Sequence, residues 1–424
     1  SKESPLTQLL PKGELVYMTN QHIGKPASPV VKKGDHVLAG QIIAEAGGFV
    51  SANIVSSVSG TVKAVEPRKN ASGGSAMAIV VENDGEYTLA EGVGVECDTN
   101  GLTGQEILSK VQKAGIVGMG GAGFPTHVKL TVKTPEKIDY VIANGAECEP
   151  YITCDDQLMR TKAAEIVEGM EYMLRLFPNA KGVVVVENNK PEAIAAMEQA
   201  CQGHDRVYVQ PVKTKYPQGG ERTLIYAVTG REINSSMLPA DAGCIVDNVE
   251  TICSIYDAVA LGRPIMKRIF TVTGKGINRP AHFEVCTGTD MAELIDAAGG
   301  LKDHAGKVIS GGPMMGFAMY DLHVPCVKTS SSLLCMQSDP VSDANAQQTA
   351  CINCGRCVSV CPGHVIPARL ATFAQRGDME SFQKFDGMEC CECGCCSYIC
   401  PAKRPLTQSI KSMRKMVLAS RKKK

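Results

Sequence analysis

The sequence lacks three features that would tie it to a particular environment. It carries 44 basic and 44 acidic residues, so its formal net charge is zero, and no global field favours nucleic acid; we expect no nucleic-acid partner. Its most apolar short run, residues 183–186, is only strand-length, whereas a membrane-spanning helix needs about 18 apolar residues or more. The first residues lack the hydrophobic core of a signal peptide. We therefore expect a protein with no transmembrane segment of its own.

Cysteine, in contrast, is abundant. Of 19 cysteines, eight fall in two regular runs near the C-terminal end, and the other eleven are scattered without the spacing of a secreted disulfide scaffold. Thiols in this number indicate a reducing compartment, and we expect a cytoplasmic location. The chain of 424 residues is also longer than a single hydrophobic core usually supports, so we expect several domains.

The two cysteine runs repeat one spacing, C-x-x-C-x-x-C-x-x-x-C-P. Structural zinc and disulfides are the alternatives, but zinc sites usually come as two CxxC pairs. The spacing is that of bacterial two-cluster ferredoxins, in which the fourth cysteine of each run ligates the other run's cluster. The resemblance implies one [4Fe-4S] cluster on Cys351, Cys354, Cys357 and Cys400, and a second on Cys390, Cys393, Cys396 and Cys361. Cys391 and Cys395 are out of register, and we expect them to pack rather than to ligate.

Short strands between glycine turns characterise the N-terminal part. Residues 31–43 follow the pattern V-x-x-G-D-x-V-x-x-G-Q-x-I, and S-G-x-V follows at residues 59–62. This resembles the barrel-sandwich hybrid of biotinyl and lipoyl domains, which carry a modified lysine at a hairpin tip. Residues 54–57 contain no lysine, so we expect an unmodified barrel-sandwich hybrid with a structural role over residues 1–95.

The rest of the chain predicts a multi-domain α/β protein. Residues 96–265 alternate between helical periodicity and apolar strands, which predicts a Rossmann-like, mostly parallel sheet covered on both faces. Residues 266–335 read as a small β-grasp module similar to an SLBB domain, and residues 336–410 as a helical two-cluster ferredoxin domain. Residues 411–424 form a basic tail, which is either a solvated end or a segment that rests on anionic lipid or an acidic partner.

Four polar or glycine-rich turns in the α/β region are candidates for ligand binding. The first, at residues 118–129, is glycine-dense, and glycine lets backbone N–H groups approach a phosphate closely. The others, at residues 144–150, 216–221 and 247–251, lie near predicted strand ends or helix starts, where α/β proteins place ligand contacts. Each turn taken alone is equally compatible with a capped helix or a solvated loop.

The order of these motifs along the chain identifies a family more specifically than any one of the turns does. G-G-A-G-F-P-T-H-V-K, N-x-A-E-x-E-P and V-x-N-V-E-T are similar to the FMN- and NADH-binding subunit of respiratory complex I. With the N-terminal module and the double cysteine run, nearly the whole chain resembles the RnfC family of the Rnf complex, a membrane-bound ferredoxin:NAD oxidoreductase. The resemblance implies FMN contacts at Gly118, Gly120, Gly121, Lys129, Asn144, Glu147, Asn248 and Thr251, and NADH contacts at Phe124, Glu149, Tyr216 and Glu221.

The chain departs from the complex I pattern at three positions of the FMN motifs. Ala146 stands in place of an aspartate, Met119 in place of an arginine, and Asp247 in place of the first of two asparagines. These departures predict weaker FMN binding or a different flavin potential.

The resemblance implies a peripheral electron-transfer subunit on the cytoplasmic side of the membrane. It would exchange a hydride between NAD(H) and FMN and pass single electrons through two [4Fe-4S] clusters to other subunits. Ferredoxin would be an indirect partner, and ions would move elsewhere in the complex. Two alternatives stay open: a soluble NADH diaphorase of a hydrogenase-type complex, and an iron–sulfur relay without catalytic activity.

Overall fold

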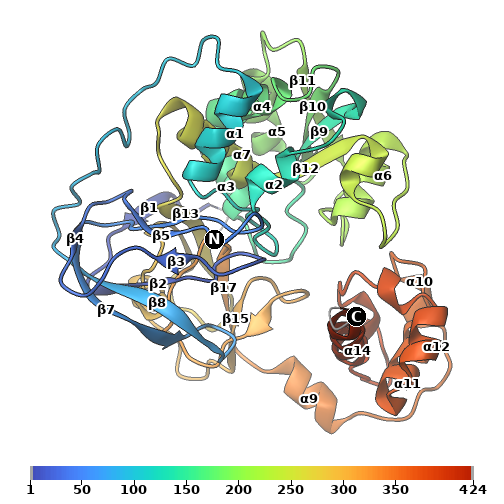
Figure 1. Cartoon of the computed structure of the whole chain (residues 1–424). Helices are drawn as coiled ribbons and strands as arrows, with labels where there is room; N and C mark the ends of the chain where they lie inside the picture. Colours follow the sequence, from blue (N-terminus) through green and yellow to red (C-terminus); the bar gives the residue numbers. More distant parts are fainter. Residues whose placement is uncertain (1–2, 422–424) are drawn as a thin grey trace.

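The computed structural model describes residues 3–421, which form successive modules along the chain (Figure 1). The first module is a pair of antiparallel sheets with strand orders β2-β8-β7-β4 and β3-β5-β6. Leu15, Ile43, Ile54 and Val81 fill the space between the sheets, as expected for a barrel-sandwich arrangement. Its strands are β2 (Glu14–Met18), β3 (Ser28–Pro29), β4 (His36–Val37), β5 (Ile42–Glu45), β6 (Ile54–Val55), β7 (Gly60–Lys69) and β8 (Ser75–Asn83).

The second module contains a four-stranded parallel sheet in the order β11-β10-β9-β12. Residues 183–186 of β10 are fully buried because helices cover both faces of the sheet, as the apolar run predicts. Helix α6 covers one face and α1, α4, α5 and α7 the other. The elements are α1 (Gly104–Lys113), α2 (Thr126–Leu130), η1 (Pro135–Lys137), β9 (Tyr140–Gly145), α3 (Cys154–Thr161), α4 (Ala163–Leu174), β10 (Lys181–Glu187), α5 (Pro191–Ala200), β11 (Val207–Val212), α6 (Glu221–Thr229), η2 (Pro239–Ala242), β12 (Cys244–Asn248) and α7 (Val249–Ala260).

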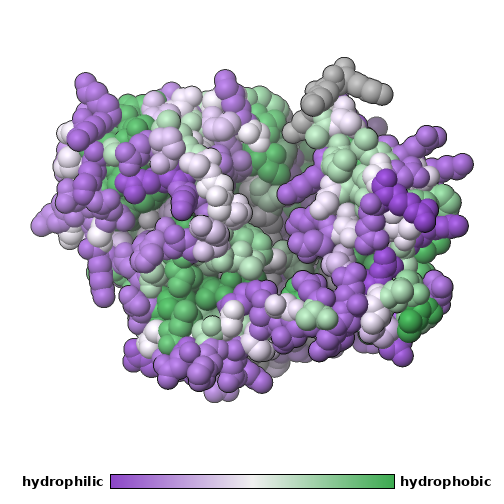
Figure 2. Space-filling model, turned by 90° about the horizontal axis from the view of Figure 1, so that it is seen from below, coloured by the Kyte–Doolittle hydropathy of each residue, from purple (hydrophilic) through white to green (hydrophobic). Residues whose placement is uncertain are grey.

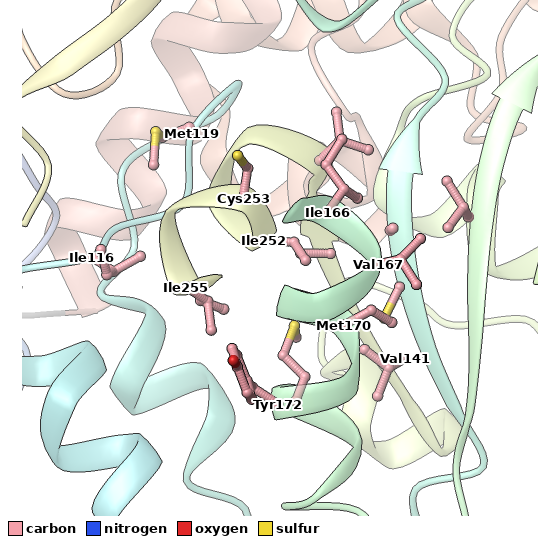
Figure 3. Close-up of a cluster of buried hydrophobic side chains, with 14 of the residues drawn as sticks. Ile116, Met119, Val141, Ile166, Val167, Met170, Tyr172, Ile252, Cys253 and Ile255 are labelled. Carbon is pink, nitrogen blue, oxygen red and sulfur yellow. The ribbon is translucent and has the colours of Figure 1, made fainter. Parts of the chain in front are cut away.

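Close packing of α4 against α7 forms the centre of this module's core. Ile166 and Met170 from α4 gather with Ile252 and Ile255 from α7 (Figure 3). Gly169 allows the approach, because a Cβ at this position would collide with the backbone carbonyl of Ile252. This contact orients α7, and therefore the polar residues at its first turn, relative to the sheet.

A third module is built on one mixed six-stranded sheet in the order β1-β14-β13-β17-β15-β16. The edge strand β1 comes from the N-terminal segment and pairs parallel to β14, so the beginning of the chain joins this sheet rather than the first module's sheets. The elements are β1 (Leu6–Leu9), β13 (Lys267–Thr273), β14 (Ala281–Cys286), α8 (Met291–Ala297), β15 (Lys307–Ser310), β16 (Phe317–Ala318) and β17 (Ser332–Met336).

The cysteine runs lie in a helical module that forms a lobe beside the larger body (Figure 2). Two helices, α11 (Pro367–Arg376) and α12 (Met379–Lys384), lie between the cysteine runs, because the first of them ends at Gly377, whose φ is +71°. The stretch expected as a basic tail is helical to Arg421 and buries Met413 and Val417; residues 422–424 lie outside the described part. The helices are α9 (Pro340–Ala346), α10 (Arg356–Ser359), α11 (Pro367–Arg376), α12 (Met379–Lys384), η3 (Gly387–Glu389), α13 (Cys395–Tyr398) and α14 (Leu406–Arg421).

None of the helices within residues 3–421 combines the length and apolar character that a membrane crossing requires.

A buried ion pair joins the second and third modules. Arg268 on β13 donates from Nε to Glu250 Oε1 over 3.0 Å, and the N–H of Ile269 donates to the same oxygen over 3.0 Å. The Arg268 side chain is 1% exposed and that of Glu250 is 9% exposed. The guanidinium also donates to the carbonyl of Lys328, whose own Nζ donates to Asn53 and Gly115 of the first two modules. This network fixes the three modules relative to one another.

The ion pair gives a stability prediction. Substitution Arg268→Met leaves Glu250 buried without its counter-charge, so the free energy of unfolding should fall by about 3–5 kcal/mol. Arg263→Met is the matched control, because Arg263 and Asp257 form a pair whose side chains are 43% and 25% exposed; its cost should be at most about 1 kcal/mol. Urea denaturation followed by circular dichroism measures both. Equal losses in the two variants would contradict the assigned role of Arg268.

Candidate functional site

A cavity of about 1020 Å³ opens at the carboxyl end of the parallel sheet. Strands β9 and β12 are neighbours, and their register places Asn144 beside Asn248. The glycine loop between α1 and α2 forms one wall, and Gly219 and Glu221 contribute to another. Ligands in open α/β sheets bind at this edge. Eight predicted positions line the cavity, namely Gly118, Gly120, Gly121, Lys129, Asn144 and Asn248 of the FMN set and Phe124 and Glu221 of the NADH set.

The glycine loop has the shape of a phosphate cradle. Gly120 has φ of +75°, and a Cβ there would lie 3.1 Å from Asn248 Nδ2. At Gly121 nothing lies within 4 Å of a Cβ position, so the missing side chain leaves the cavity open. The loop is held at its base because the N–H of Met119 donates to Thr251 Oγ1 over 2.9 Å. Thr251 therefore supports the loop from α7, and it does not line the cavity.

Lys129 and Asp247 form the charged pair of the cavity wall. Lys129 Nζ donates to Asp247 Oδ1 over 2.8 Å and to the carbonyl of Val246 over 2.7 Å. Burial acts to lower the pKa of Lys129, but the charge and hydrogen bond of Asp247 together with the charge of Glu221 outweigh it, and the pKa is raised. Burial raises the pKa of Asp247, and Lys129 opposes this effect. The other carboxylate oxygen of Asp247 is buried with no donor in the part of the chain that the structure describes.

Glu147 faces away from the cavity. Its two carboxylate oxygens accept from the backbone N–H groups of Asp155 and Asp156 at 3.0 and 3.2 Å, which caps the N-terminus of α3. Lys190 Nζ lies 3.3 Å from the same carboxylate. Glu147, Cys154 and Asp155 place ligand-type atoms within 4.8 Å of one another, but the oxygens of Glu147 are already engaged in capping. The group is therefore a helix cap and gives no evidence for a metal.

Asp155 is a further residue of the site that sequence reasoning missed. Asn248, whose Oδ1 caps α7, donates from Nδ2 to Asp155 Oδ2 over 2.8 Å. Burial, together with the charges of Glu147 and Glu250, raises the pKa of Asp155 well above its usual range. The only signal in the sequence is the paired aspartates at the start of a helix, which is also the ordinary pattern of a helix N-terminus.

The four residues predicted to contact NADH lie in three different places in the structure. Phe124 and Glu221 line the large cavity. Glu149 borders a second cavity of about 580 Å³ on the other side of the glycine loop, and it accepts from the N–H groups of Met314 and Met315 at 3.1 and 2.7 Å. Tyr216 points to the cysteine module, where its hydroxyl donates to the carbonyl of Cys393 over 2.7 Å.

The cysteines gather around two cavities in the helical module. The first cysteine cavity, of about 200 Å³, is lined by three cysteines of the first run and by Cys400 of the second. The second cysteine cavity, of about 20 Å³, is lined by three cysteines of the second run and by Cys361 of the first. Each cavity is therefore lined by a crossed set of four thiols, the donor set that a [4Fe-4S] cluster requires. Cys391 and Cys395 also border the second cysteine cavity.

Family models match the chain in the order that the structure shows. They are the RnfC barrel-sandwich hybrid domain over residues 1–86, the Nuo51 FMN-binding domain over residues 111–257, the SLBB domain over residues 269–318 and a 4Fe-4S binding domain over residues 347–366. These matches confirm the predicted fold class and identify the second module as an FMN-binding domain.

Among solved structures, the chain is similar to an NAD⁺-reducing [NiFe]-hydrogenase in the H2-reduced state. The TM-score is 0.52 at 19% identity, with 74% of this chain and 61% of that chain covered. At this identity the similarity shows the fold alone.

Curated relatives extend over most of the chain. The C subunit of the Na(+)-translocating ferredoxin:NAD(+) oxidoreductase complex of Acetobacterium woodii is 44% identical, covering 95% of this chain and 90% of the relative. The C subunit of the proton-translocating ferredoxin:NAD(+) oxidoreductase complex of Clostridium ljungdahlii is 44% identical over 84% of this chain and 77% of the relative. The chain belongs to the RnfC family of ion-translocating oxidoreductase complexes.

Proposed function

We propose that the chain transfers electrons between NAD(H) and partner subunits of an Rnf-type ferredoxin:NAD oxidoreductase, through FMN and two [4Fe-4S] clusters. The observation that carries this proposal is the large cavity beneath the glycine loop in the same chain as two crossed sets of four cysteines. Bound FMN supplies exchange of two electrons with NAD(H) and of single electrons with the clusters. Relatives named as ferredoxin:NAD(+) oxidoreductase subunits support this activity over a soluble diaphorase or an inactive relay.

The residues around the cavity fit a flavin nucleotide. The glycine loop leaves room for a phosphate, and backbone N–H groups hold such an anion without a long side chain. Asn144 and Asn248 orient the two strand ends that border the cavity. Glu147 and Thr251 contribute by fixing α3 and the glycine loop.

For NAD(H), Phe124 and Glu221 are the contacts that the geometry supports best, because both line the cavity proposed for FMN. An aromatic face can stack on a nicotinamide or adenine ring, and a carboxylate can accept from ribose hydroxyls. Glu149 lies next to the adjoining cavity across the glycine loop and would contact a part of the dinucleotide that extends there. Tyr216 is assigned instead to the contact with the cysteine module.

The positions of the two cysteine cavities suggest an order for the clusters. The second cysteine cavity is next to Cys393, which is hydrogen-bonded to Tyr216 of the flavin module. The first cysteine cavity is lined by Cys351 and Cys354, which are exposed. We place the second-cavity cluster next to the flavin and the first-cavity cluster next to a partner subunit on the cytoplasmic side of the membrane. Ferredoxin would then reach this chain only through other subunits.

Anaerobic titration of the cluster-containing, FMN-loaded protein with NADH tests the proposal. One visible spectrum reports both centres, and we expect the flavin band to bleach together with the broad iron–sulfur absorption. About eight irons per chain are expected for two [4Fe-4S] clusters. Bleaching of the flavin alone would show that the clusters are not connected to it, and no bleaching at all would overturn the catalytic proposal.

The crossed ligand sets make a prediction about single cysteine variants. Cys400→Ser should lose the same cluster as Cys354→Ser, because both thiols line the first cysteine cavity. Electron paramagnetic resonance of the reduced protein compares the remaining cluster signals. Cys391→Ser, a cysteine out of register in the second run, is the control and should keep about eight irons. A Cys400→Ser spectrum that matches Cys393→Ser would favour uncrossed pairing.

Substitution of Asp247 tests the charge pair of the flavin cavity. Asp247→Asn removes the counter-charge of Lys129, so the dianionic phosphate of FMN should bind about 3- to 10-fold more tightly. Quenching of flavin fluorescence in the FMN-free protein measures the dissociation constant. Asp241→Asn is the control, because this acid lines the same cavity but is exposed and bonded to the N–H of Leu238. Weaker binding in Asp247→Asn than in the control would show that the carboxylate itself holds the ligand.

A further inference from the structure

The flavin module and the cysteine module meet at a small polar contact. Arg222 Nη1 donates to Glu389 Oε2 over 2.8 Å, and the backbone N–H of Ser235 donates to the same oxygen over 2.9 Å. Tyr216 adds its hydrogen bond to the carbonyl of Cys393. We call Tyr216, Arg222, Ser235 and Glu389 the docking contact. Glu389 directly precedes the first cysteine of the second run, so the contact reaches the cluster site itself.

One turn carries both the docking contact and a wall of the flavin cavity. Within residues 216–222, Gly219 and Glu221 line the large cavity, whereas Tyr216 and Arg222 face the cysteine module. Two residues at and just after the end of β9 form hydrogen bonds with this turn. Asn144 Nδ2 donates to the carbonyl of Gly219 over 2.9 Å, and the N–H of Gly219 donates to Cys148 Sγ over 3.3 Å. Movement of the turn would therefore move both the cavity wall and the cysteine module.

The cysteine module also packs closely against the backbone of the third module. A Cβ on Gly394 would lie 3.0 Å from the carbonyl oxygen of Met314, so the second cysteine run packs closely on the third module there. Glu149 holds the N–H groups of Met314 and Met315. Two turns therefore align the second cysteine cavity, and each turn also carries residues that border one of the two larger cavities, namely Gly219 and Glu221 in one case and Met315 in the other.

The docking contact is strong enough to position the cysteine module but too weak to hold it in place permanently. The side chains of Arg222 and Glu389 are 36% and 27% exposed, and ion pairs of this exposure are weak and screened by salt. The segment that contains α9 connects the third module covalently to the cysteine module. A lobe held by a linker and a weak polar contact can separate from the body.

We propose that Tyr216, Arg222 and Glu389 are positioning residues that dock the second cysteine cavity against the flavin cavity and so set the rate of electron transfer between them. The proposal rests on the proposed function of the two sites. In the balanced reaction NADH is oxidised to NAD⁺ with release of one proton, and two [4Fe-4S]²⁺ clusters each take up one electron. None of the three residues changes its bonding in that reaction; they hold donor and acceptor in place.

Hydrogen exchange of the complete, cofactor-loaded chain tests the docking. Arg222→Glu places a carboxylate opposite Glu389, and it should increase exchange of the amides of residues 214–220 and 387–394 in low salt. Arg222→Lys keeps the charge and should restore protection. Wild-type protein in high salt should resemble Arg222→Glu, because salt screens the pair. Equal protection in the Glu and Lys variants would overturn the assignment of Arg222 and Glu389.

Rapid mixing with NADH separates docking from flavin chemistry. Glu389→Gln and Glu389→Lys change the contact from the side of the cysteine module and leave the turn at residues 216–222 intact. They should leave the rate of flavin bleaching unchanged and slow cluster bleaching about fivefold, the loss expected for one weak polar interaction. Glu380→Gln is the control, since Glu380 is exposed on the same module. If wild-type flavin does not bleach, the proposed function fails. If flavin and clusters bleach at wild-type rates in both variants, the docking proposal alone is overturned.

Discussion

The parallel pairing of β9 with β12 is the constraint on which the site depends. Parallel strands end at the same edge of the sheet, and the register places Asn144 and Asn248 side by side there. The turn that carries Gly219 is bonded to Asn144, and the glycine loop packs against Asn248 and Thr251. Both walls of the large cavity are therefore positioned from one pair of strand ends.

Buried carboxylates surround this edge of the sheet. The negative charge of each one is balanced by a different cation or set of hydrogen bonds. Glu250 is neutralised by Arg268, and Glu147 caps α3 beside Lys190. Asp247 offsets Lys129 within the cavity, so the wall offers a paired cation rather than a free one. Burying charge is costly unless it is paired and hydrogen-bonded. The site combines this electrostatic balance with an open glycine loop, which suits an anionic cofactor that also offers hydrogen-bond donors.

Local patterns predicted many of the elements correctly. The apolar run at residues 183–186 lies within β10, and the region expected to alternate between helix and strand contains the parallel sheet and its helices. In the C-terminal basic stretch, Lys and Arg residues conceal the apolar spacing of Ile410, Met413 and Val417, which pack in the helical module. Likewise, β1 joins a strand some 270 residues away in the sequence, a pairing that no local signal contains.

The sequence by itself determined the family and the order of the modules, since spacing and motif order can be read along the chain. It also identified the glycine loop and strand ends that line the large cavity. Only the tertiary structure decided which way the individual side chains face. Glu147 turns to a helix terminus, and Tyr216 turns to the cysteine module. A motif specifies a position along the chain, whereas the direction of its side chain depends on the partners that distant segments bring to it.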